Sequence, residues 1–585
     1  MQRHQRVAAR ACGVIAALAF LAGCDRSSPP PATASTPPSA EAAKQLDWAG
    51  FVDKYIEDYF ANNPAFAAGA GRHEFDGQLP DWSAEGIQKT IAWLEKSRAT
   101  AAGFTDDALP APQRFQRDYL ISRIDDDLFW LRDARLPFTN VSYYFDYGLD
   151  PNTYVTVPYA PAEERLRAFI TYLKAIPNAL AQIRGNLQMP MPRTFLEYGV
   201  RGFAGFADYY NKDVFAAFAE VQDPALQSEL KTTIEPAAAA MTEMSKWLES
   251  QRPQATDNFA LGAERFAAMV RMTEGVTTPL ERLEAIGRAD LERNLIALEQ
   301  ACKEYLPKGS VAECIAKQEA NKPQGGPVAG ARNQLAQLRQ FIVDHQVVSI
   351  PGTEEAKVEA APAYKAQNAA YINIPGPYEK SMPSIYYIAP PDPTWSKKEQ
   401  DAYIPGEADL LFTSVHEVWP GHFLQFLHSN RSSWRFGQLM VGYAFAEGWA
   451  HYTEEMMVEQ GLAQGSAERH IGQLLNALLR NVRYVCAIGL HTRGMTVGQC
   501  EQMFLEKAHQ DPGNARQQAA RGTYDPAYLN YTMGKLMIVK LRTDWLAANP
   551  GKSLQQFHDQ FLSFGGPPIP LVRAQMLPGA AGELF

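Results

Sequence analysis

The segment from His416 to His422, with the sequence HEVWPGH, constrains this chain of 585 residues more than any other part of it. Histidines are common zinc ligands, and Glu417 is placed to take a proton from water at such an ion. On an unbroken helix, however, a separation of six residues leaves the two rings roughly 240° apart. Because Pro420 disrupts helical hydrogen bonding and Gly421 accepts unusual backbone angles, we expect a distorted helix that turns His422 back toward His416. The alternative is that the two histidines are unrelated polar residues at a helix end.

A third ligand is expected from Glu447, which follows His422 by twenty-five residues in a strongly helical segment. A carboxylate completes the two-histidine, one-glutamate set that is typical of catalytic zinc sites. His451 lies one helical turn after Glu447 on the same face, and we expect it to reach the metal or to hydrogen-bond one of the ligands. The predicted metal ligands are therefore His416, His422 and Glu447, with Zn²⁺ as the cofactor and Glu417 as the general base.

The N-terminus has the layout of a secretion signal, because arginines precede the apolar run Val14–Ala22. The sequence LAGC that ends at Cys24 resembles the bacterial lipobox, which implies cleavage before Cys24 and lipidation of its thiol. An uncleaved signal anchor is the alternative, although the run is short for a membrane span. We expect a signal peptide over 1–23 and a Pro, Ala and Ser-rich linker over 24–46 that tethers the protein to the membrane, facing the periplasm.

The overall charge argues against a nucleic-acid partner. The formal net charge is −10, and Lys and Arg are scattered along the chain instead of forming a basic patch that would neutralise phosphates. A hydrophobic content of 46% with 21% charged residues is typical of a globular protein.

Four cysteines remain once Cys12 and Cys24 are set aside. In an oxidising periplasm, their grouping into two short-range pairs predicts two disulfides. Zinc binding by these cysteines is less favoured, because neither pair has the two-residue spacing of a thiolate site. The predicted disulfides are Cys302–Cys314 and Cys486–Cys500.

The residues after the linker are mostly helical in pattern. Apolar residues recur three and four apart in 163–187 and 279–305, for example. Between Val347 and Pro405 the pattern changes to short β-type runs, separated by proline-rich turns, at 346–350, 357–360, 371–374 and 384–388. We therefore predict a mainly α fold over 47–585, with sub-lobes 47–345 and 346–585 and a small sheet beside the metal-binding helix. Such a sheet either pairs with an extended substrate or only packs.

Four motifs follow one another in a specific order along the chain. They are His416-Glu417-x-x-Pro420-Gly421-His422, Glu447-Gly448-Trp449-Ala450-x-Tyr452, Gly489-Leu490-His491 with Gly494-Met495-Thr496, and Tyr531-x-x-Gly534-Lys535. Together they resemble the motifs of the bacterial family known as domain of unknown function 885, which itself looks related to the zincin metallopeptidases. The resemblance runs from about Trp48 to the C-terminus.

The resemblance implies further catalytic residues. Amide hydrolysis needs a donor aimed at the developing oxyanion, and Tyr531 is the leading candidate because related helical zinc peptidases use a tyrosine from a late helix. His491 is the second candidate. Two positions depart from the family pattern: Ala487 stands where the family often has aspartate, and His451 stands where it has an apolar residue. We expect His451 to compensate if that aspartate normally orients a ligand.

These features predict a lipid-anchored zinc peptidase that acts on short peptides. A carboxypeptidase would need a cation for the terminal carboxylate, and Arg521 or Lys535 would serve. One alternative is a zinc amidase or esterase acting on a non-peptide substrate such as a cell-wall fragment. Another is a catalytically inactive zinc-binding envelope lipoprotein.

No organic cofactor is implied, because a phosphate-binding loop and a dinucleotide fingerprint are absent from the sequence. The sequence gives no indication of the oligomeric state.

Overall fold

A computed structural model describes residues 47–361, 370–379, 382–391, 396–579 and 582–585. The predictions on the signal peptide, the linker and the lipidation of Cys24 lie outside the described residues. Trp48–Phe585 forms one compact unit. No helix in the described ranges is both long enough and apolar enough to span a membrane.

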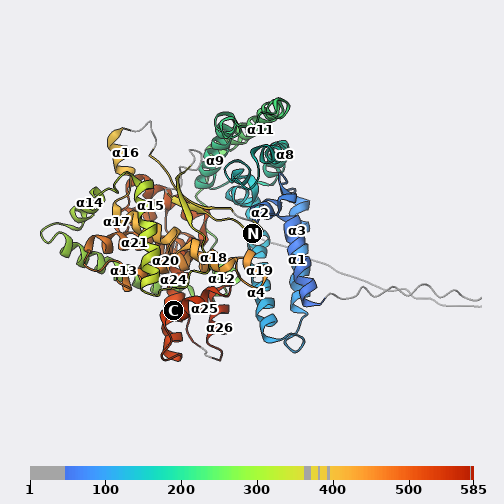
Figure 1. Ribbon diagram of the computed structural model, residues 1–585. Helices are drawn as coiled ribbons and strands as arrows, with labels where there is room; N and C mark the ends of the chain where they lie inside the picture. Colours follow the sequence, from blue (N-terminus) through green and yellow to red (C-terminus); the bar gives the residue numbers. More distant parts are fainter. Residues whose placement is uncertain (1–46, 362–369, 380–381, 392–395, 580–581) are drawn as a thin grey trace, which may run out of the picture. The chain divides into compact units, whose positions relative to one another are not determined.

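The described unit is mainly helical, as the sequence predicts (Figure 1). The helices before the sheet are α1 (Trp48–Asn62), α2 (Pro64–Gly69), α3 (Ala84–Ala102), α4 (Ala111–Leu128), α5 (Leu136–Thr139), α6 (Ser142–Tyr144), α7 (Asn152–Val155), α8 (Ala162–Asn186), α9 (Arg193–Lys212), α10 (Val214–Ala217), α11 (Pro224–Gln251), α12 (Ala263–Glu274), α13 (Leu280–Tyr305), α14 (Val311–Ala320) and α15 (Pro327–Asp344).

The remaining helices follow the sheet and carry all the predicted metal ligands. They are α16 (Lys397–Tyr403), α17 (Glu407–Glu417), α18 (His422–Ser429), α19 (Arg435–Leu439), α20 (Tyr443–Glu459), α21 (Ala467–Thr492), α22 (Val497–Glu506), α23 (Pro512–Tyr524), α24 (Asn530–Ala548), α25 (Leu554–Leu562) and α26 (Ile569–Met576). The helices α8 and α13 confirm the two long periodic segments to within one residue at each end.

Two hydrophobic clusters hold these helices together. One contains buried residues of α1 to α11 together with Phe436 and Leu439 of α19 and the following Met440. The other is built mainly from α12 to α26 and the sheet. The expected sub-lobe boundary at residue 345 does not coincide with this division. That boundary follows the start of the β-type pattern. Helices α13 and α15 come before it but pack along α21 and α17, which come after it.

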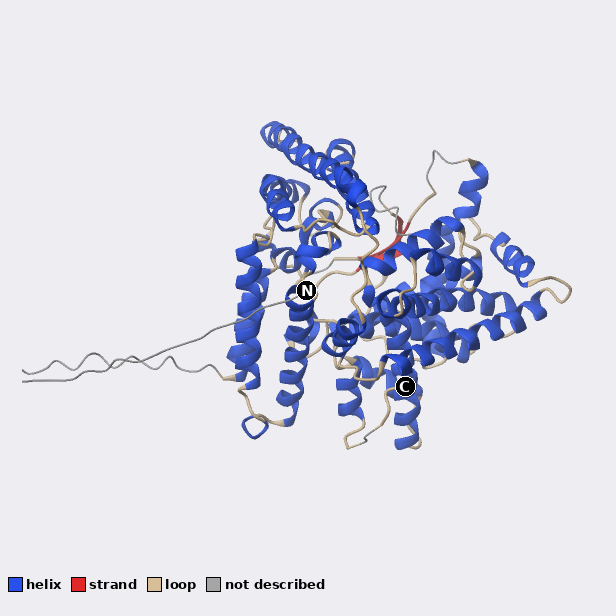
Figure 2. Ribbon diagram, turned by 180° about the vertical axis from the view of Figure 1, so that it is seen from behind, coloured by secondary structure: helices blue, strands red, loops and turns tan. Residues whose placement is uncertain are grey.

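A small three-stranded sheet lies beside α15 and α17 (Figure 2). Its strands are β1 (Ala356–Ala360), β2 (Ala370–Asn373) and β3 (Ser384–Ile388). The central strand β3 pairs in parallel with β1 and antiparallel with β2, and all its side chains are buried. The edge strand β2 contacts α17, so the predicted sheet does lie next to the helix that carries His416.

The first expected β run, 346–350, is not a strand. Gln346 has a φ of 49°, which ends α15 and turns the chain. The following backbone groups bond to side chains instead of a neighbouring strand: the Val347 carbonyl accepts from His558, and the Ser349 N–H donates to Asp559. The pattern of apolar residues here reflects burial of Val347 and its neighbour in a loop.

Both predicted disulfides are confirmed. Cys302 on α13 bonds to Cys314 on α14, and Cys486 on α21 bonds to Cys500 on α22. The second disulfide joins consecutive helices because Thr496 opens α22 with a capping box, its hydroxyl accepting from the Gln499 N–H.

Helices α20 and α24 approach each other closely at a pair of glycines. A Cβ added at Gly534 would lie 2.2 Å from the carbonyl oxygen of Ala444, and one added at Gly448 would lie 2.5 Å from the Cα of Gly534. Only glycine permits this separation. The contact matters for the site because Glu447 precedes one glycine, and Tyr531 lies one turn before the other.

We expect Gly534→Ala to destabilise the fold by about 1–3 kcal/mol, because the new methyl group forces two helix backbones apart. Thermal unfolding of the purified variant would show a lower midpoint. Gly205→Ala is the matched control: Gly205 lies inside α9 with open space around it, so removing backbone freedom there should not lower the midpoint. Equal midpoints for the Gly534 variant and the wild type would contradict the account of the crossing.

Candidate metal centre

The predicted break between the two histidines is present. Helix α17 ends at Glu417 and α18 begins at His422, and the four residues between them form a wide turn. The Gly421 N–H donates to the carbonyl oxygen of Val415 at 2.9 Å, six residues back instead of four. This turn accommodates the two residues by which the histidine spacing of six exceeds the four-residue spacing of a helical pair. The two imidazole rings therefore lie close together, with their centres 4.8 Å apart.

Gly421 is required at the centre of this turn. A Cβ at this position would lie 1.7 Å from the carbonyl oxygen of His416, far inside van der Waals contact. The obstacle is backbone, which cannot move aside as a flexible side chain can. Its lack of a side chain therefore lets the chain fold back tightly enough to bring His422 beside His416.

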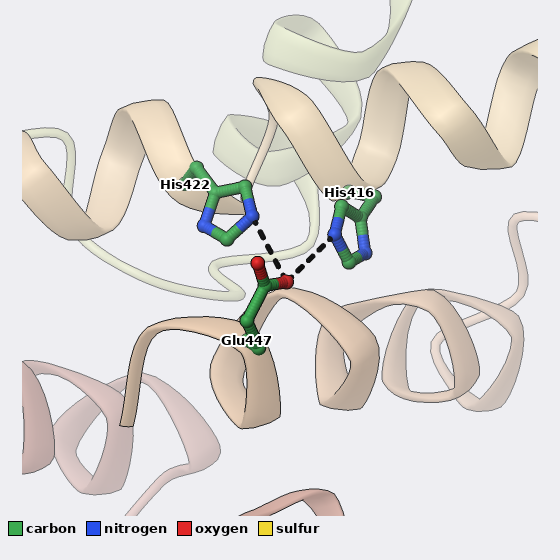
Figure 3. Close-up of side chains that lie close together, drawn as sticks. All are labelled: His416, His422 and Glu447. Carbon is green, nitrogen blue, oxygen red and sulfur yellow. Dashed lines mark ion pairs between the residues drawn. The ribbon is translucent and has the colours of Figure 1, made fainter. Parts of the chain in front are cut away.

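Glu447 approaches the two histidines from α20, on the other side of the site. Figure 3 shows both rings facing one oxygen of this carboxylate. The Nε2 atoms of His416 and His422 each lie 3.3 Å from Oε2 of Glu447. The three side chains form a group whose ligand atoms all lie within 4.8 Å of one another. The sequence thus predicts a set of residues that the structure brings together.

The donor set fits a zinc ion. Oε2 of Glu447 is buried and makes no hydrogen bond, although two imidazole nitrogens face it. Two imidazole nitrogens and a carboxylate oxygen that face one another favour a positive charge between them, which a metal ion would supply. Two imidazoles and one carboxylate are a common catalytic zinc set, and three protein ligands leave a fourth position for water or substrate.

A second carboxylate, Glu454, holds His416 in place from behind. His416 donates from Nδ1 to Oε1 of Glu454 at 2.7 Å, which leaves Nε2 free to face Glu447. The other oxygen of Glu454 lies 3.2 Å from Nδ1 of His451, and Arg480 lies 3.5 Å from Oε1. Carboxylates that accept from the remote nitrogen of a metal-binding histidine fix its tautomer and raise its basicity.

The charges of these groups depend on one another. Burial lowers the pKa of His416, but its contacts with the carboxylates of Glu447 and Glu454 outweigh burial and raise the pKa to about 9. Burial raises the pKa of Glu447, yet the two histidines lower it well below its usual range. The carboxylate is therefore charged, and the site favours a positive charge between the three side chains.

Glu454 was not among the residues predicted from the sequence, although its spacing from Glu447 points to it. It follows Glu447 by seven residues on α20, and seven residues are nearly two full helical turns. Both carboxylates therefore lie on the same face. The His451 ring lies 3.2 Å from Glu454, and within the described residues no side-chain hydrogen bond joins it to His416, His422 or Glu447, so its link to His416 runs through this shared carboxylate.

Glu417 directly follows His416 in the chain, and the Tyr531 ring lies beside the His416 ring. Glu417 is half-buried and makes no hydrogen bond or ion pair with any described residue. The ring of Tyr531 lies nearly parallel to that of His416, with centres 6.3 Å apart. Burial and the nearby charge of Glu447 raise the pKa of Tyr531, so its hydroxyl stays protonated and able to donate.

His491 and Lys535 have other partners. His491 accepts from the Leu261 N–H through Nδ1 and donates through Nε2 to the Gly522 carbonyl, so neither nitrogen is left for a substrate. Lys535 is completely buried, with its ammonium 2.9 Å from Asp290 and 3.0 Å from Glu455. The geometry does not support the expected catalytic role of His491 or the expected substrate contact of Lys535. Their motifs reflect packing.

Arg521 and Ala487 complete the predicted set. Arg521 pairs with Asp525 at 2.8 Å and donates to the hydroxyl of Tyr443, beside Tyr531. Ala487 is buried inside α21 among apolar side chains.

Residues 64–576 match the family described as bacterial protein of unknown function DUF885. The chain belongs to this family. No curated protein matches it.

Two solved structures share the fold of this DUF885 chain. A candidate lipoprotein of unknown function from Shewanella oneidensis aligns with a TM-score of 0.74 at 23% identity, over 91% of this chain and 100% of the other. A candidate lipoprotein from Colwellia psychrerythraea aligns with a TM-score of 0.78 at 18% identity, over 90% and 98%. The helical architecture is therefore established in other bacterial proteins.

We expect Glu454→Gln to weaken zinc binding by about 10–100-fold while the protein stays folded, because the amide polarises His416 less than a carboxylate does. Competition with a zinc-responsive dye measures the affinity. The control is Glu455→Gln: Glu455 is the next residue but pairs with Lys535 and Arg293, away from His416. Equal zinc affinity for the wild type and Glu454→Gln would show that this carboxylate does not tune the site.

Proposed function

We propose that this DUF885 chain is a zinc-dependent hydrolase that cleaves peptide bonds in short peptides. The observation that carries the proposal is the convergence of His416, His422 and Glu447 on one point, with Glu417 as the residue that directly follows His416 in the chain. A purely structural zinc site is usually closed by four protein ligands and has no use for an adjacent base.

The residues of the chain divide the chemical work between them. His416, His422 and Glu447 would hold a zinc ion, which when bound would supply the positive charge that acidifies water and polarises a carbonyl. Glu417 takes a proton from the attacking water and later gives it to the leaving amine nitrogen, so water is added across the amide bond. The protonated hydroxyl of Tyr531 donates a hydrogen bond to the oxyanion as it develops. Glu454 keeps the His416 ring in the required tautomer.

We also propose that the enzyme is lipid-anchored and faces the periplasm. The arginine-rich and apolar N-terminus with its LAGC sequence supports export and lipidation. The two disulfides support an oxidising compartment, because disulfides are rare in the cytosol.

The proposal is tested by incubating the purified protein with a mixed library of short peptides and identifying the products by mass spectrometry. We expect cleavage with zinc, none after treatment with a chelator, and recovery when zinc is restored. Cleavage that survives complete removal of metal would refute the proposed mechanism.

In the same assay, Glu417→Gln should keep one zinc per chain and lose turnover by about 10²–10⁴-fold, because the amide cannot accept the proton. Zinc content is measured by mass spectrometry of the metal. Full turnover by this variant would rule out Glu417 as the base, and loss of its zinc would make the variant uninformative about proton transfer and assign Glu417 to the ligand set instead.

A further inference from the structure

Two arginines lie over the ring of Tyr531 and a third lies beside His416, and one of the three has no anionic partner among the described residues. The guanidinium carbons of Arg483 and Arg521 lie 4.9 Å and 6.0 Å from the ring centre. The third, Arg480, reaches within 3.5 Å of Nδ1 of His416. Arg480 has Glu454 at 3.5 Å and Arg521 has Asp525 at 2.8 Å. Within the described residues, no carboxylate pairs with Arg483.

The Arg483 side chain is also almost fully buried. Its residue is 7% exposed, and Nε donates to the side-chain oxygen of Gln518 at 2.9 Å. No described residue forms a hydrogen bond or ion pair with its two terminal nitrogens. Burial and the like charge of Arg521 lower its pKa to about 10, so Arg483 remains a cation at neutral pH. A buried, uncompensated charge is costly to keep without a ligand that neutralises it.

We infer that Arg483 binds the C-terminal carboxylate of the peptide substrate, so that the enzyme removes residues from the C-terminus. The inference rests on the proposed hydrolase function and specifies its substrate class. A guanidinium offers two parallel N–H donors that match the two oxygens of a carboxylate. With Nε held by Gln518, the two terminal nitrogens are the donors that remain for such a bidentate contact.

The distances suit a carboxylate close to the scissile bond. The Arg483 guanidinium lies 4.9 Å from the Tyr531 ring centre, which in turn lies 6.3 Å from the His416 ring centre. An extended peptide advances about 3.3–3.6 Å for each residue, so the two distances together span no more than about three residues. A terminal carboxylate one or two residues beyond the cleaved bond falls within this span.

The two cations that the sequence suggested for this task are already neutralised. Lys535 contacts Asp290 and Glu455 in a fully buried cluster. Arg521 makes two contacts with Asp525, through Nε and Nη2. Arg483 therefore lies beside Tyr531 as a cation with no carboxylate partner among the described residues.

Binding is tested without turnover, using zinc-loaded Glu417→Gln protein and two probes, pentaalanine and pentaalanine amide, in calorimetric titrations. We expect the free acid to bind at least about 30-fold more tightly than the amide, because the amide cannot neutralise Arg483. Adding Arg483→Met should abolish this preference and leave the affinity for the amide unchanged. Equal affinities for the two probes, or no binding of either, would overturn the inference.

A structural role for Arg483 predicts a different result. Replacing a buried unpaired charge by an apolar side chain of similar length should leave the thermal midpoint unchanged or raise it, whereas loss of a structural contact would lower it. Arg483→Lys should keep part of the preference for the acid. The matched control is Arg493→Met, which should change neither affinity. Arg493 is the residue that follows α21, and it is exposed and paired with Glu281 and Glu284.

Turnover of the same probes by the wild type separates the two proposals. Cleavage of the acid, releasing one or two alanines from its C-terminus, together with slow cleavage of the amide, supports both. Equal cleavage of the acid and the amide supports the proposed peptidase function but overturns the inference that Arg483 recognises the terminal carboxylate. Cleavage of neither probe, with the binding preference intact, overturns hydrolysis of these peptides and keeps Arg483 as the carboxylate site.

Discussion

The close contact between the Gly421 backbone and the carbonyl oxygen of His416 is the constraint on which the rest of the site depends. A chain that continued as a regular helix after Glu417 would direct His422 away from His416. The turn closed by the Gly421 N–H instead places both Nε2 atoms 3.3 Å from one oxygen of Glu447. Two side chains that are close in sequence and one from another helix then converge on one point, which is the arrangement that the proposed zinc site needs.

Support for this point comes from contacts farther away. The glycine pair Gly448 and Gly534 lets α20 and α24 pack with their backbones almost touching, which sets Glu447 and Tyr531 on facing helices. Behind the three converging side chains, Glu454 accepts a hydrogen bond from His416 and forms an ion pair with Arg480. Buried charges in this region are thus compensated in pairs, and Arg483 stands out because no carboxylate among the described residues pairs with it, which is why we infer a partner from the substrate.

The sequence predicted the parts of the site that local patterns specify. Helical periodicity, the Pro420-Gly421 break, the capping box at Thr496 and the cysteine spacing all act over a few residues, and the structure contains each of them. The prediction that Glu447 lies with the two histidines is confirmed, and its reason was that a carboxylate in a strongly helical segment completes the histidine pair.

Sequence-based predictions failed, or left residues out, where a residue's role depends on how distant segments of the chain pack against one another. Glu454 shares a face with Glu447, but α20 also carries Glu455 and Glu459, and only the packed structure shows which carboxylate reaches His416. His491 belongs to a conspicuous motif, yet its nitrogens bond to backbone groups of two distant segments. The run at 346–350 is apolar because it is buried, and a single left-handed residue, Gln346, turns it into a loop.

The most direct test of the account is to locate the ion. Crystals grown from zinc-loaded protein should give an anomalous diffraction peak at the zinc edge about 2.0–2.2 Å from Nε2 of His416, Nε2 of His422 and a carboxylate oxygen of Glu447. A peak elsewhere in the molecule, or none between these three side chains at saturating zinc, would contradict the assignment of this site as the metal centre.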